Sequence, residues 1–437
     1  MIMNSYKIKD RTPFRFSGRK IYVYMMLCVL LAGCGGGGDE VEPVPTPTPT
    51  PTPGPEITIT ASTKSLSLSP VGGEQTFTVT TNASDWSVTS SESWLSVARQ
   101  GSNTVKIQSN ANLNVSRSAV VRCTISGKNV SVSVSVAQSK VTELQSDSLA
   151  LSDLFHITGG SSNSLARLGV TVTDGHVTML KLKDSNLSGS IPASLGRLTQ
   201  LRYCDLSGND LTGSLPAEIS SLTELEYLDL SDNALSGNIP SLSQLKKLVV
   251  LDLSANDFAT LPALQSPDME YLSVHKNKLS GNLPAGWADY RKLVYIDASA
   301  NAFTGGIPGG WSALTNLKAL HLYGNALSGS VPGWLESLTY LKSLGLSHNN
   351  LTGSIPASLG VLLQLETLWL SQNKLNGQIP SSLLNNSRWN SWESQVCPQQ
   401  SGYGFTNSTL KTGMVKSGSL EATGLGKKLK EEYRNRY

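Results

Sequence analysis

The sequence has little charge and no concentration of basic residues in its central part. Asp, Glu, Lys and Arg make up 15% of the 437 residues, and the formal net charge is +3. The basic excess belongs to residues 1–33 and 408–437, so residues 34–407 have a net charge of about −6. Proteins that bind nucleic acids present a clustered basic surface. The composition therefore excludes nucleic acid as a partner.

Cysteine is scarce as well. The five cysteines show no paired spacing and no metal-ligand pattern, which argues against a disulfide scaffold and a zinc site. Cys204 occupies a position where other repeats have Leu or Ile, so we expect a buried thiol that packs as a small apolar side chain. The sequence predicts no metal and no cofactor.

Motifs of common enzymes are absent. The chain has no GxSxG, no HExxH, no paired catalytic Cys and His, and no phosphate-binding loop. We therefore expect no catalytic residues and no enzymatic activity.

Long apolar runs are also missing. The run IYVYMMLCVLLAG covers residues 21–33, whereas a helix that spans a bilayer needs roughly 20 apolar residues. Six basic residues precede this run, and small residues end it, which is typical of an export signal. Residues 1–33 are therefore predicted to be a signal peptide.

The end of this segment, Leu31-Ala32-Gly33-Cys34, resembles the lipobox of bacterial lipoproteins. That resemblance implies cleavage before Cys34 and lipidation of its thiol; an uncleaved N-terminal anchor is the alternative. Residues 34–55 are a glycine-rich lead followed by a Pro-Thr repeat, which is a semi-rigid spacer. Acidic residues soon after Cys34 are similar to a surface-export signal of some Gram-negative lipoproteins. We expect a protein on the outer membrane, exposed at the cell surface and attached through this lipid only.

Residues 56–139 contain short runs that alternate apolar and polar residues, such as QTFTVTT and NVSVSVSVAQ. Alternation with period two, broken by Gly, Asn and Ser, predicts an all-β sandwich. The runs WSV at Trp86, WLSV at Trp94 and the closing VSVAQ resemble a BACON domain. This resemblance implies an immunoglobulin-like sandwich that binds glycan or acts as a spacer. The two tryptophans fit core packing better than sugar stacking.

Residues 140–176 are predicted to cap the region that follows. The stretch SDSLALSDLFHITGG, residues 146–160, predicts a short helix that ends at two glycines. A strand pair should follow it and turn at Asp174-Gly175. Such a cap covers the open end of a repetitive core.

Residues 177–386 repeat one pattern nine times, with successive starts 21 to 24 residues apart. Repeats of this length stack on their neighbours because none can bury its apolar face alone. The pattern LxxLxLxxNxLxGxIPxxLxxLxx resembles the plant-type leucine-rich repeat. This resemblance implies a curved solenoid, a parallel sheet on its concave face, and a ladder of asparagine hydrogen bonds from Asn209 to Asn373. The short fourth repeat lacks the LxGxIP glycine, so we expect either a local change of curvature or an interrupted second sheet around residues 258–268.

The variable strand positions are expected to face solvent on the concave side, where they form a tyrosine column beside an aspartate column. Two interpretations remain open: the columns stabilise the sheet through cross-strand contacts, or they bind a ligand. The ligand-binding candidates are Tyr203, Asp205, Tyr227, Asp229, Asp252, Tyr271, His275, Tyr295, Asp297, His321, Tyr323 and Trp369.

After the last repeat we expect an aromatic C-terminal cap at residues 387–407, and a basic tail at residues 408–437 that is disordered or a frayed helix. The predicted fold is mainly β with repeats: an immunoglobulin-like β-sandwich followed by a curved leucine-rich-repeat solenoid. The predicted function is that of a monomeric, lipid-anchored surface protein whose concave face binds a protein or peptide. The alternative is a glycan-binding accessory protein.

Overall fold

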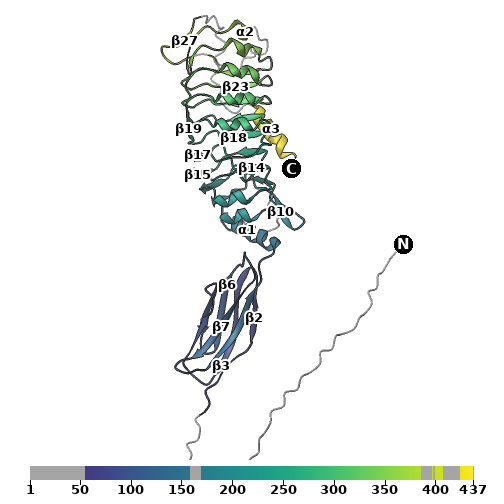
Figure 1. The fold of residues 1–437 in the computed structure, drawn as a ribbon, viewed down its shortest axis with the longest axis vertical. Helices are drawn as coiled ribbons and strands as arrows, with labels where there is room; N and C mark the ends of the chain where they lie inside the picture. The colour runs from purple at the N-terminus through teal and green to yellow at the C-terminus, as the bar shows by residue number, and fades with distance from the viewer. Residues whose placement is uncertain (1–54, 158–168, 385–395, 397–398, 407–423, 437) are drawn as a thin grey trace, which may run out of the picture. The chain divides into compact units, whose positions relative to one another are not determined.

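The computed structural model describes residues 55–157, 169–384, 396, 399–406 and 424–436 (Figure 1). The predictions of a signal peptide, a lipidated Cys34 and a Pro-Thr spacer concern residues 1–55, which lie almost wholly outside the described residues. Among the helices that are described, none is long and apolar enough to cross a membrane.

Eight strands between residues 59 and 138 form two four-stranded sheets, β1-β3-β6-β5 and β2-β8-β7-β4. Side chains from both sheets join one hydrophobic cluster, in which Val121 and Val134 are fully buried. The period-two alternation of the sequence puts every second side chain into this cluster. The strands are β1 (Ile59–Ala61), β2 (Ser65–Leu68), β3 (Gly72–Thr81), β4 (Trp86–Ser90), β5 (Leu95–Gln100), β6 (Thr104–Asn110), β7 (Arg117–Ile125) and β8 (Ser131–Gln138).

The two tryptophans of this region pack in its core, as the sequence favoured. Trp86 is buried, and Trp94 is partly buried against the same cluster. The guanidinium carbon of Arg99 lies 4.3 Å from the centre of the Trp86 ring, and that of Arg117 lies 4.3 Å from the Trp94 ring. Each ring is therefore already engaged by a cation–π contact, which leaves it poorly placed to stack on a sugar.

Helix α1 (Glu143–Ile157) begins three residues before the predicted start. Thr142 and Gln145 exchange hydrogen bonds between side chain and backbone, at 2.9 and 3.2 Å, and form a capping box that the sequence reading missed. The carboxylate of Asp147 accepts a 2.8 Å hydrogen bond from the backbone N–H of Val177. This bond ties the helix to the first strands of the repeat region.

The predicted strand pair is present as β9 (Val170–Thr173) and β10 (His176–Lys181). Asp174 and Gly175 both have positive φ, at 52° and 83°, as a tight hairpin turn requires. Strand β10 then opens a ten-stranded sheet in which strands from successive repeats pair in parallel. Its other members are β12 (Tyr203–Asp205), β14 (Tyr227–Asp229), β16 (Val250–Asp252), β18 (Tyr271–Ser273), β20 (Tyr295–Asp297), β22 (Ala319–His321), β23 (Ser343–Gly345) and β25 (Thr367–Trp369).

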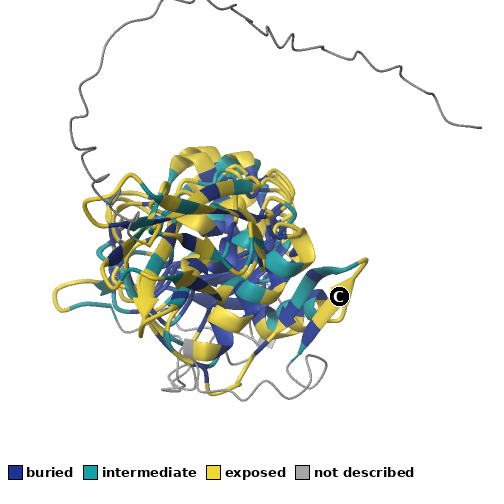
Figure 2. Ribbon diagram, turned by 90° about the horizontal axis from the view of Figure 1, so that it is seen from below, coloured by how far each residue is buried: buried dark blue, intermediate teal, exposed yellow. Residues whose placement is uncertain are grey.

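On the opposite side of the solenoid, short helices follow the proline of most repeats. The prolines before the 3-10 helices have an extended backbone, and the apolar residue three positions later enters the core. Buried residues line the interior of the stack, while the loops at its rim are exposed (Figure 2). These helices are η2 (Ala193–Arg197), η3 (Ala217–Ser221), η4 (Ala285–Asp289), η5 (Gly309–Ala313), η6 (Gly333–Ser337), η7 (Ala357–Val361) and α2 (Ser381–Leu384).

The asparagine ladder is confirmed. In repeat two the amide nitrogen of Asn209 donates to the carbonyls of Leu182 and Leu206, at 2.9 and 2.8 Å, and its oxygen accepts from the N–H of Leu187 at 3.0 Å. The same arrangement recurs through Asn373. Gln399, in the predicted C-terminal cap, continues the ladder by accepting from Leu375 N–H at 3.2 Å. The ladder therefore satisfies buried backbone groups that no strand pairs.

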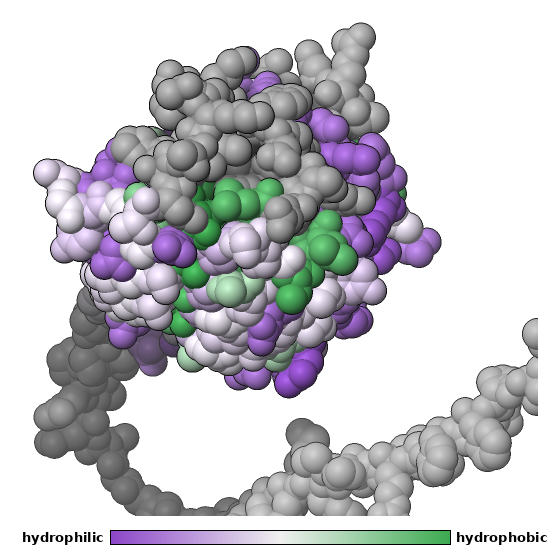
Figure 3. Space-filling view, turned by 90° about the horizontal axis from the view of Figure 1, so that it is seen from above, coloured by the Kyte–Doolittle hydropathy of each residue, from purple (hydrophilic) through white to green (hydrophobic). Residues whose placement is uncertain are grey.

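The second sheet is interrupted at the short fourth repeat, which is one of the two predicted alternatives. Strands β11 (Ser188–Ser190), β13 (Asp210–Gly213), β15 (Ala234–Asn238) and β17 (Asp257–Thr260) form one sheet, which ends there. Later repeats form two smaller sheets, from β19 (Ser280–Asn282) and β21 (Ala302–Thr304), and from β24 (Thr352–Gly353), β26 (Lys374–Gly377) and β27 (Gly404–Phe405). Mainly polar side chains cover the visible described surface, with a few hydrophobic patches among them (Figure 3).

Candidate functional site

The predicted tyrosine and aspartate columns lie on the face of the ten-stranded sheet that points away from the leucine core. Parallel pairing in register sets Tyr203, Tyr227, Val250, Tyr271 and Tyr295 next to one another. Equivalent side chains on neighbouring strands stand roughly 4.8 Å apart. Tyr203 stacks on Tyr227 with ring centres 4.3 Å apart, and Tyr271 stacks on Tyr295 at 4.6 Å. We call this outward surface of the sheet the concave face.

Each aspartate of the column is oriented by a serine two residues later. One carboxylate oxygen of Asp229 accepts hydrogen bonds from the N–H and hydroxyl of Ser231, at 3.1 and 2.6 Å. The other oxygen accepts from the Tyr227 hydroxyl at 3.2 Å. The same serine contacts hold the other aspartates of the column, through the pairs Asp205 and Ser207, Asp252 and Ser254, and Asp297 and Ser299.

The serines were missed by the sequence reading, although the recurring Asp-x-Ser spacing could have found them. Because the serine occupies one carboxylate oxygen, the second oxygen is the one presented to the outside of the sheet. The result is a row of carboxylates with fixed orientation, which favours binding of cations.

The tail was expected to be disordered or a frayed helix, and within its described part, residues 424–436, the structure shows a helix. Gly424–Arg434 forms helix α3, which lies against the concave face (Figure 1). Leu425, Leu429 and Tyr433 are four residues apart and therefore share one side of the helix. An isolated helix of this length is marginal in water, so its contacts with the sheet are what fix it. The sequence alone did not show those contacts.

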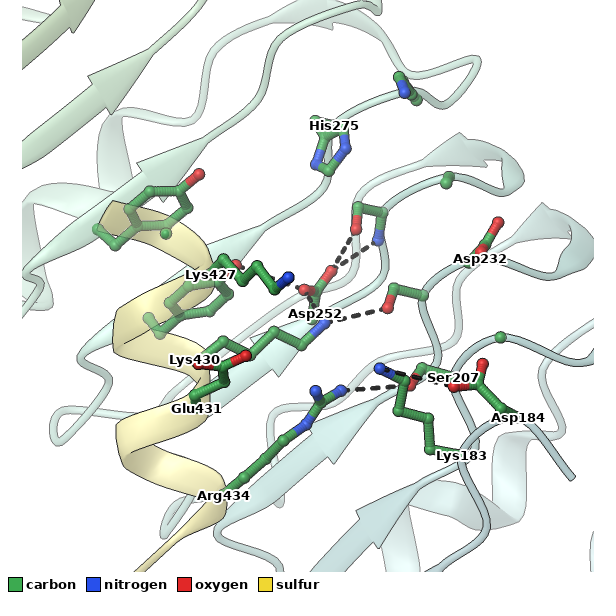
Figure 4. A pocket seen from close by; sticks show the side chains of 18 residues that line it. Lys183, Asp184, Ser207, Asp232, Asp252, His275, Lys427, Lys430, Glu431 and Arg434 are labelled. Carbon is green, nitrogen blue, oxygen red and sulfur yellow. Dashed lines mark hydrogen bonds and ion pairs between the residues drawn. The ribbon is translucent and has the colours of Figure 1, made fainter. Parts of the chain in front are cut away.

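Two basic side chains of α3 bind the aspartate column. Figure 4 shows Lys430 beside Asp252 and Arg434 beside Ser207. The amine of Lys430 lies 2.6 Å from Asp229 and 2.5 Å from Asp252. The guanidinium of Arg434 lies 2.9 Å from Asp229 and 3.1 Å from Asp205. Lys430 thus lies between Asp229 and Asp252, and Arg434 lies between Asp205 and Asp229. Each basic side chain therefore pairs with carboxylates on two neighbouring strands.

Apolar contacts accompany these ion pairs. Leu429 and Tyr433 are buried in one cluster with the tyrosine column. The Tyr433 hydroxyl donates to the carboxylate of Glu270. A Cβ atom at Gly426 would lie 2.5 Å from the Tyr295 hydroxyl oxygen, so only glycine allows this approach of the helix.

The expectation that these columns face solvent is therefore wrong. Tyr227 and Asp229 are fully buried, and Tyr271 is 4% exposed. The reasons are tertiary: α3 covers part of the face, and the aromatic side chains of neighbouring strands cover one another.

Burial and neighbouring charges shift the pKa values of the ionisable side chains where α3 meets the sheet. Burial raises the pKa of Asp229, and the charges of Asp252 and Asp205 raise it further, against the opposing effect of Lys430. Burial would raise the pKa of Asp252 too, but the charge and hydrogen bond of Lys430 hold that pKa below its ordinary value. Burial lowers the pKa of Lys430, yet the two carboxylates outweigh it and raise that pKa overall. Lys430 is therefore a charged group in this site at neutral pH.

The C-terminal half of the concave face is arranged differently. His321 lies 3.6 Å from Asp297 through Nδ1 and 2.8 Å from the Ser343 hydroxyl through Nε2. Its ring stacks on Trp369 at 5.9 Å between centres, and Trp369 meets Tyr323 edge to face. His275, which is 20% exposed, lies 3.9 Å from Asp297. The structure thus brings His275 and His321 to the carboxylate of Asp297, and it packs Trp369 and Tyr323 against His321.

These histidines determine the titration of Asp297. Burial raises its pKa, but the neighbouring imidazoles of His321 and His275, together with the hydrogen bond from Ser299, lower it to about 2. Burial and the charge of Asp297 raise the pKa of Tyr323 to about 12. Within the described residues, no group of three or more His, Cys, Asp and Glu side chains is placed to hold a metal ion.

A polar cleft of about 430 Å³ runs between α3 and the loops that follow the strands (Figure 4). Lys183, Asp184 and His275 line it from the solenoid, and Lys427 and Glu431 line it from α3. Both sides of the cleft are charged, so polar groups of a bound segment could extend from the concave face into it. Burial raises the pKa of the Cys204 thiol beneath the sheet, which is a free and buried cysteine, as predicted.

Family models for leucine-rich repeats match three parts of the chain. Residues 200–222 match "Leucine Rich Repeat", residues 223–266 match "Leucine Rich repeats (2 copies)", and residues 315–375 match "Leucine rich repeat". No curated protein matches the sequence.

Several solved structures have a similar fold. The crystal structure of PEPR1-AtPEP1 is 28% identical, with a TM-score of 0.51 over 60% of this chain and 42% of that one. The ectodomain of the Arabidopsis receptor kinase HAESA in complex with an IDA peptide hormone ligand is 29% identical, with a TM-score of 0.44 over 56% of this chain and 48% of that one. A leucine-rich repeat protein of Leptospira interrogans is 27% identical, with a TM-score of 0.41 over 51% of this chain and 61% of that one.

The chain contains leucine-rich repeats, and they are similar to those of a plant receptor structure. It spans less than half the length of the first two of these structures. The solenoid is a binding-domain fold that is typically not enzymatic.

Proposed function

We propose that the concave face binds a protein or peptide ligand, through the tyrosine and aspartate columns predicted from the sequence. The observation that supports this most directly is α3 itself. A segment of polypeptide lies on this face and is held there by four ion-pair contacts from Lys430 and Arg434 and by buried apolar side chains. A surface that holds one peptide segment in this way has the chemistry to hold another. The similarity to PEPR1-AtPEP1 supports a binding role at the level of the repeat class.

The glycan alternative receives less support. Trp86 and Trp94, its candidate platforms, pack in the core of the sandwich beneath arginine side chains. The tyrosines of the concave face stack on each other through their ring faces, which are the faces that a sugar would need. Peptide binding is therefore the function that the geometry supports best.

The test is to select binders from an unbiased displayed peptide library with the full chain. Affinities are then compared with those for the Tyr227→Ala, Tyr271→Ala and Tyr295→Ala triple variant. We expect selected peptides to bind this variant at least about tenfold more weakly, a loss of roughly 1.4 kcal/mol. Tyr340→Ala is the matched control, because Tyr340 is 55% exposed and lies outside the columns. Selected peptides that bind all three proteins equally would show that the concave face is not the binding surface.

We also propose that this binding takes place at a bacterial cell surface, with Cys34 attached to the outer membrane through a lipid. The lipobox-like sequence and the Pro-Thr spacer support this. Radiolabelled palmitate should enter the full chain in cells and be absent from the Cys34→Ser variant. Equal labelling of both proteins would rule out this anchor.

A further inference from the structure

We infer that the N-terminal half of the concave face, formed by β12, β14, β16 and β18, is a receptor for a cationic amphipathic helix, and that α3 occupies it as an intramolecular ligand. An external ligand of the same chemistry must then displace α3. This inference rests on the proposed function and specifies the chemical class of its ligand.

The first argument is the charge of the face. Asp205, Asp229 and Asp252 stand on three neighbouring strands, and all three are almost fully buried. Within the described part of the chain, their ion pairs are with Lys430 and Arg434 of α3. Three carboxylates on neighbouring strands give this part of the face a concentrated negative charge, which favours a cationic occupant. Lys430 and Arg434 of α3 supply that positive charge.

The second argument is the pattern of α3. Leu425, Leu429 and Tyr433 form one row along the helix, and Gly426, Lys430 and Arg434 form the adjacent row, each with a spacing of four residues. Both rows meet the sheet, where Gly426, Leu429 and Tyr433 are buried. The exposed side is formed by Lys427, Lys428, Glu431 and Glu432.

These rows define what a competing ligand must offer. Two basic residues four positions apart match the spacing of the three aspartates. Apolar residues directly before them match the tyrosine column, and a glycine one turn earlier fits against Tyr295. Protein grooves recognise amphipathic helices in this way, through contacts with side chains that are three or four positions apart.

The third argument is the covalent link. Because α3 belongs to the same chain, its effective concentration at the face is on the order of millimolar. An external helix with similar affinity must compete against that concentration. The native chain is therefore selective for ligands that bind the face more strongly than α3 does.

The test uses the full chain and a fluorescent synthetic peptide of residues 424–436, GLGKKLKEEYRNR. Binding is measured by fluorescence anisotropy against three proteins: the native chain, the Lys430→Glu/Arg434→Glu variant, and the Lys427→Glu/Lys428→Glu variant. The last is the matched control, since it makes the same change of charge on the exposed side of α3. We expect the peptide to bind the Lys430→Glu/Arg434→Glu chain at least about tenfold more tightly than the other two, because only this chain has lost its internal competitor.

A second variant separates displacement from charge. Gly426→Leu places a side chain against Tyr295 and should open the face to the peptide without changing any charge. Lys428→Leu, on the exposed side of the helix, should not. A peptide with both Lys430 and Arg434 replaced by glutamate should bind none of these chains.

Two results would overturn the inference. One is equal binding of the peptide to the native, released and control chains. The other is an absence of binding to both released chains at peptide concentrations up to about 1 mM, the effective concentration expected for a linked segment. If library peptides depend on the tyrosine column but lack basic residues, the proposed function stands and the cationic helix is the wrong ligand class. If no library peptide depends on that column, the proposed function itself fails.

Discussion

The two halves of the concave face pair their buried aspartates with different kinds of partner. In the N-terminal half, Asp229 and Asp252 are paired with Lys430, a residue roughly 180–200 positions later in the chain. In the C-terminal half, Asp297 is paired with His321 from the adjacent strand and with His275. One half pairs its carboxylates with basic side chains of a separate helix, and the other pairs its carboxylate with imidazole side chains of the solenoid itself.

This difference indicates which half is built to exchange a partner. The histidines beside Asp297 belong to the solenoid and stay when α3 leaves. The cations beside Asp229 and Asp252 leave with α3, so these carboxylates alternate between an internal and an external partner. The interrupted second sheet after β17 falls at the same stage of the array, where the short fourth repeat contributes Val250 rather than a tyrosine to the column.

The largest expected difference in stability between the two halves comes from replacing one aspartate in each half by alanine. We expect Asp297→Ala to lower the free energy of unfolding by about 3–5 kcal/mol, because it leaves His321 and Ser299 without their partner in a fully buried place. Asp229→Ala should cost the solenoid only about 1–2 kcal/mol, since Lys430 and Arg434 can move into water. Urea denaturation followed by circular dichroism gives both values.

The release of α3 provides the second readout. Trypsin should cleave α3 faster in Asp229→Ala, and at the native rate in Asp297→Ala. Asp257→Ala is the control, because Asp257 forms only an exposed ion pair with Lys278. Equal losses of stability for the Asp229 and Asp297 variants, with no change at α3, would mean that the two halves do not differ.

A smaller effect is expected from acid. The folded pKa of Asp297 is about 2, against an ordinary value of 3.8, so its stabilising contribution is complete above about pH 4 and disappears as the pH falls toward 2. A difference of this size corresponds to about 2 kcal/mol. The free energy of unfolding should therefore fall by that much more in the native chain than in Asp297→Asn between pH 5 and pH 2. Parallel pH curves for the two proteins would contradict the histidine pairing.

The smallest effect distinguishes the two halves through their serines. Ser231→Ala and Ser299→Ala each remove one hydroxyl that donates to an aspartate, and each should cost about 1 kcal/mol. Ser231 also accepts a 3.1 Å hydrogen bond from Lys430, so its loss should speed trypsin cleavage of α3 as well. If trypsin cleaved α3 at the same raised rate in Ser299→Ala, the hydrogen bond between Lys430 and Ser231 would not be what holds α3 in place.

Much of the fold could be predicted because its elements are set by local spacing. Period-two alternation predicted the sandwich strands, and the repeat period predicted a stacked array. The resemblance to leucine-rich repeats implied the parallel sheet and the asparagine ladder. The start of α1 was misplaced because its capping box, Thr142 with Gln145, precedes the stretch chosen for the helix. The interruption after β17 was one of two alternatives predicted from a missing glycine and three missing residues.

The candidate site was predicted only in part. The columns are where the sequence predicted them, but the prediction that they are exposed to solvent was wrong. The serines that orient the aspartates were overlooked. The partner of the columns was missed because the tail looks like a short, charged segment with little apolar content. Its few apolar residues become one face only when a helix forms against the sheet.

The sequence by itself determined that this chain is a repeat protein and which residues stand side by side along its sheet. A fixed period places equivalent residues in register, and that follows from the chain's own spacing. Only the tertiary structure decided what covers the sheet. Tyr227 and Arg434 are 207 residues apart, and no local pattern links them. Their proximity arises from the charge of three carboxylates and from apolar surface, which act through space and leave no periodic trace in the sequence.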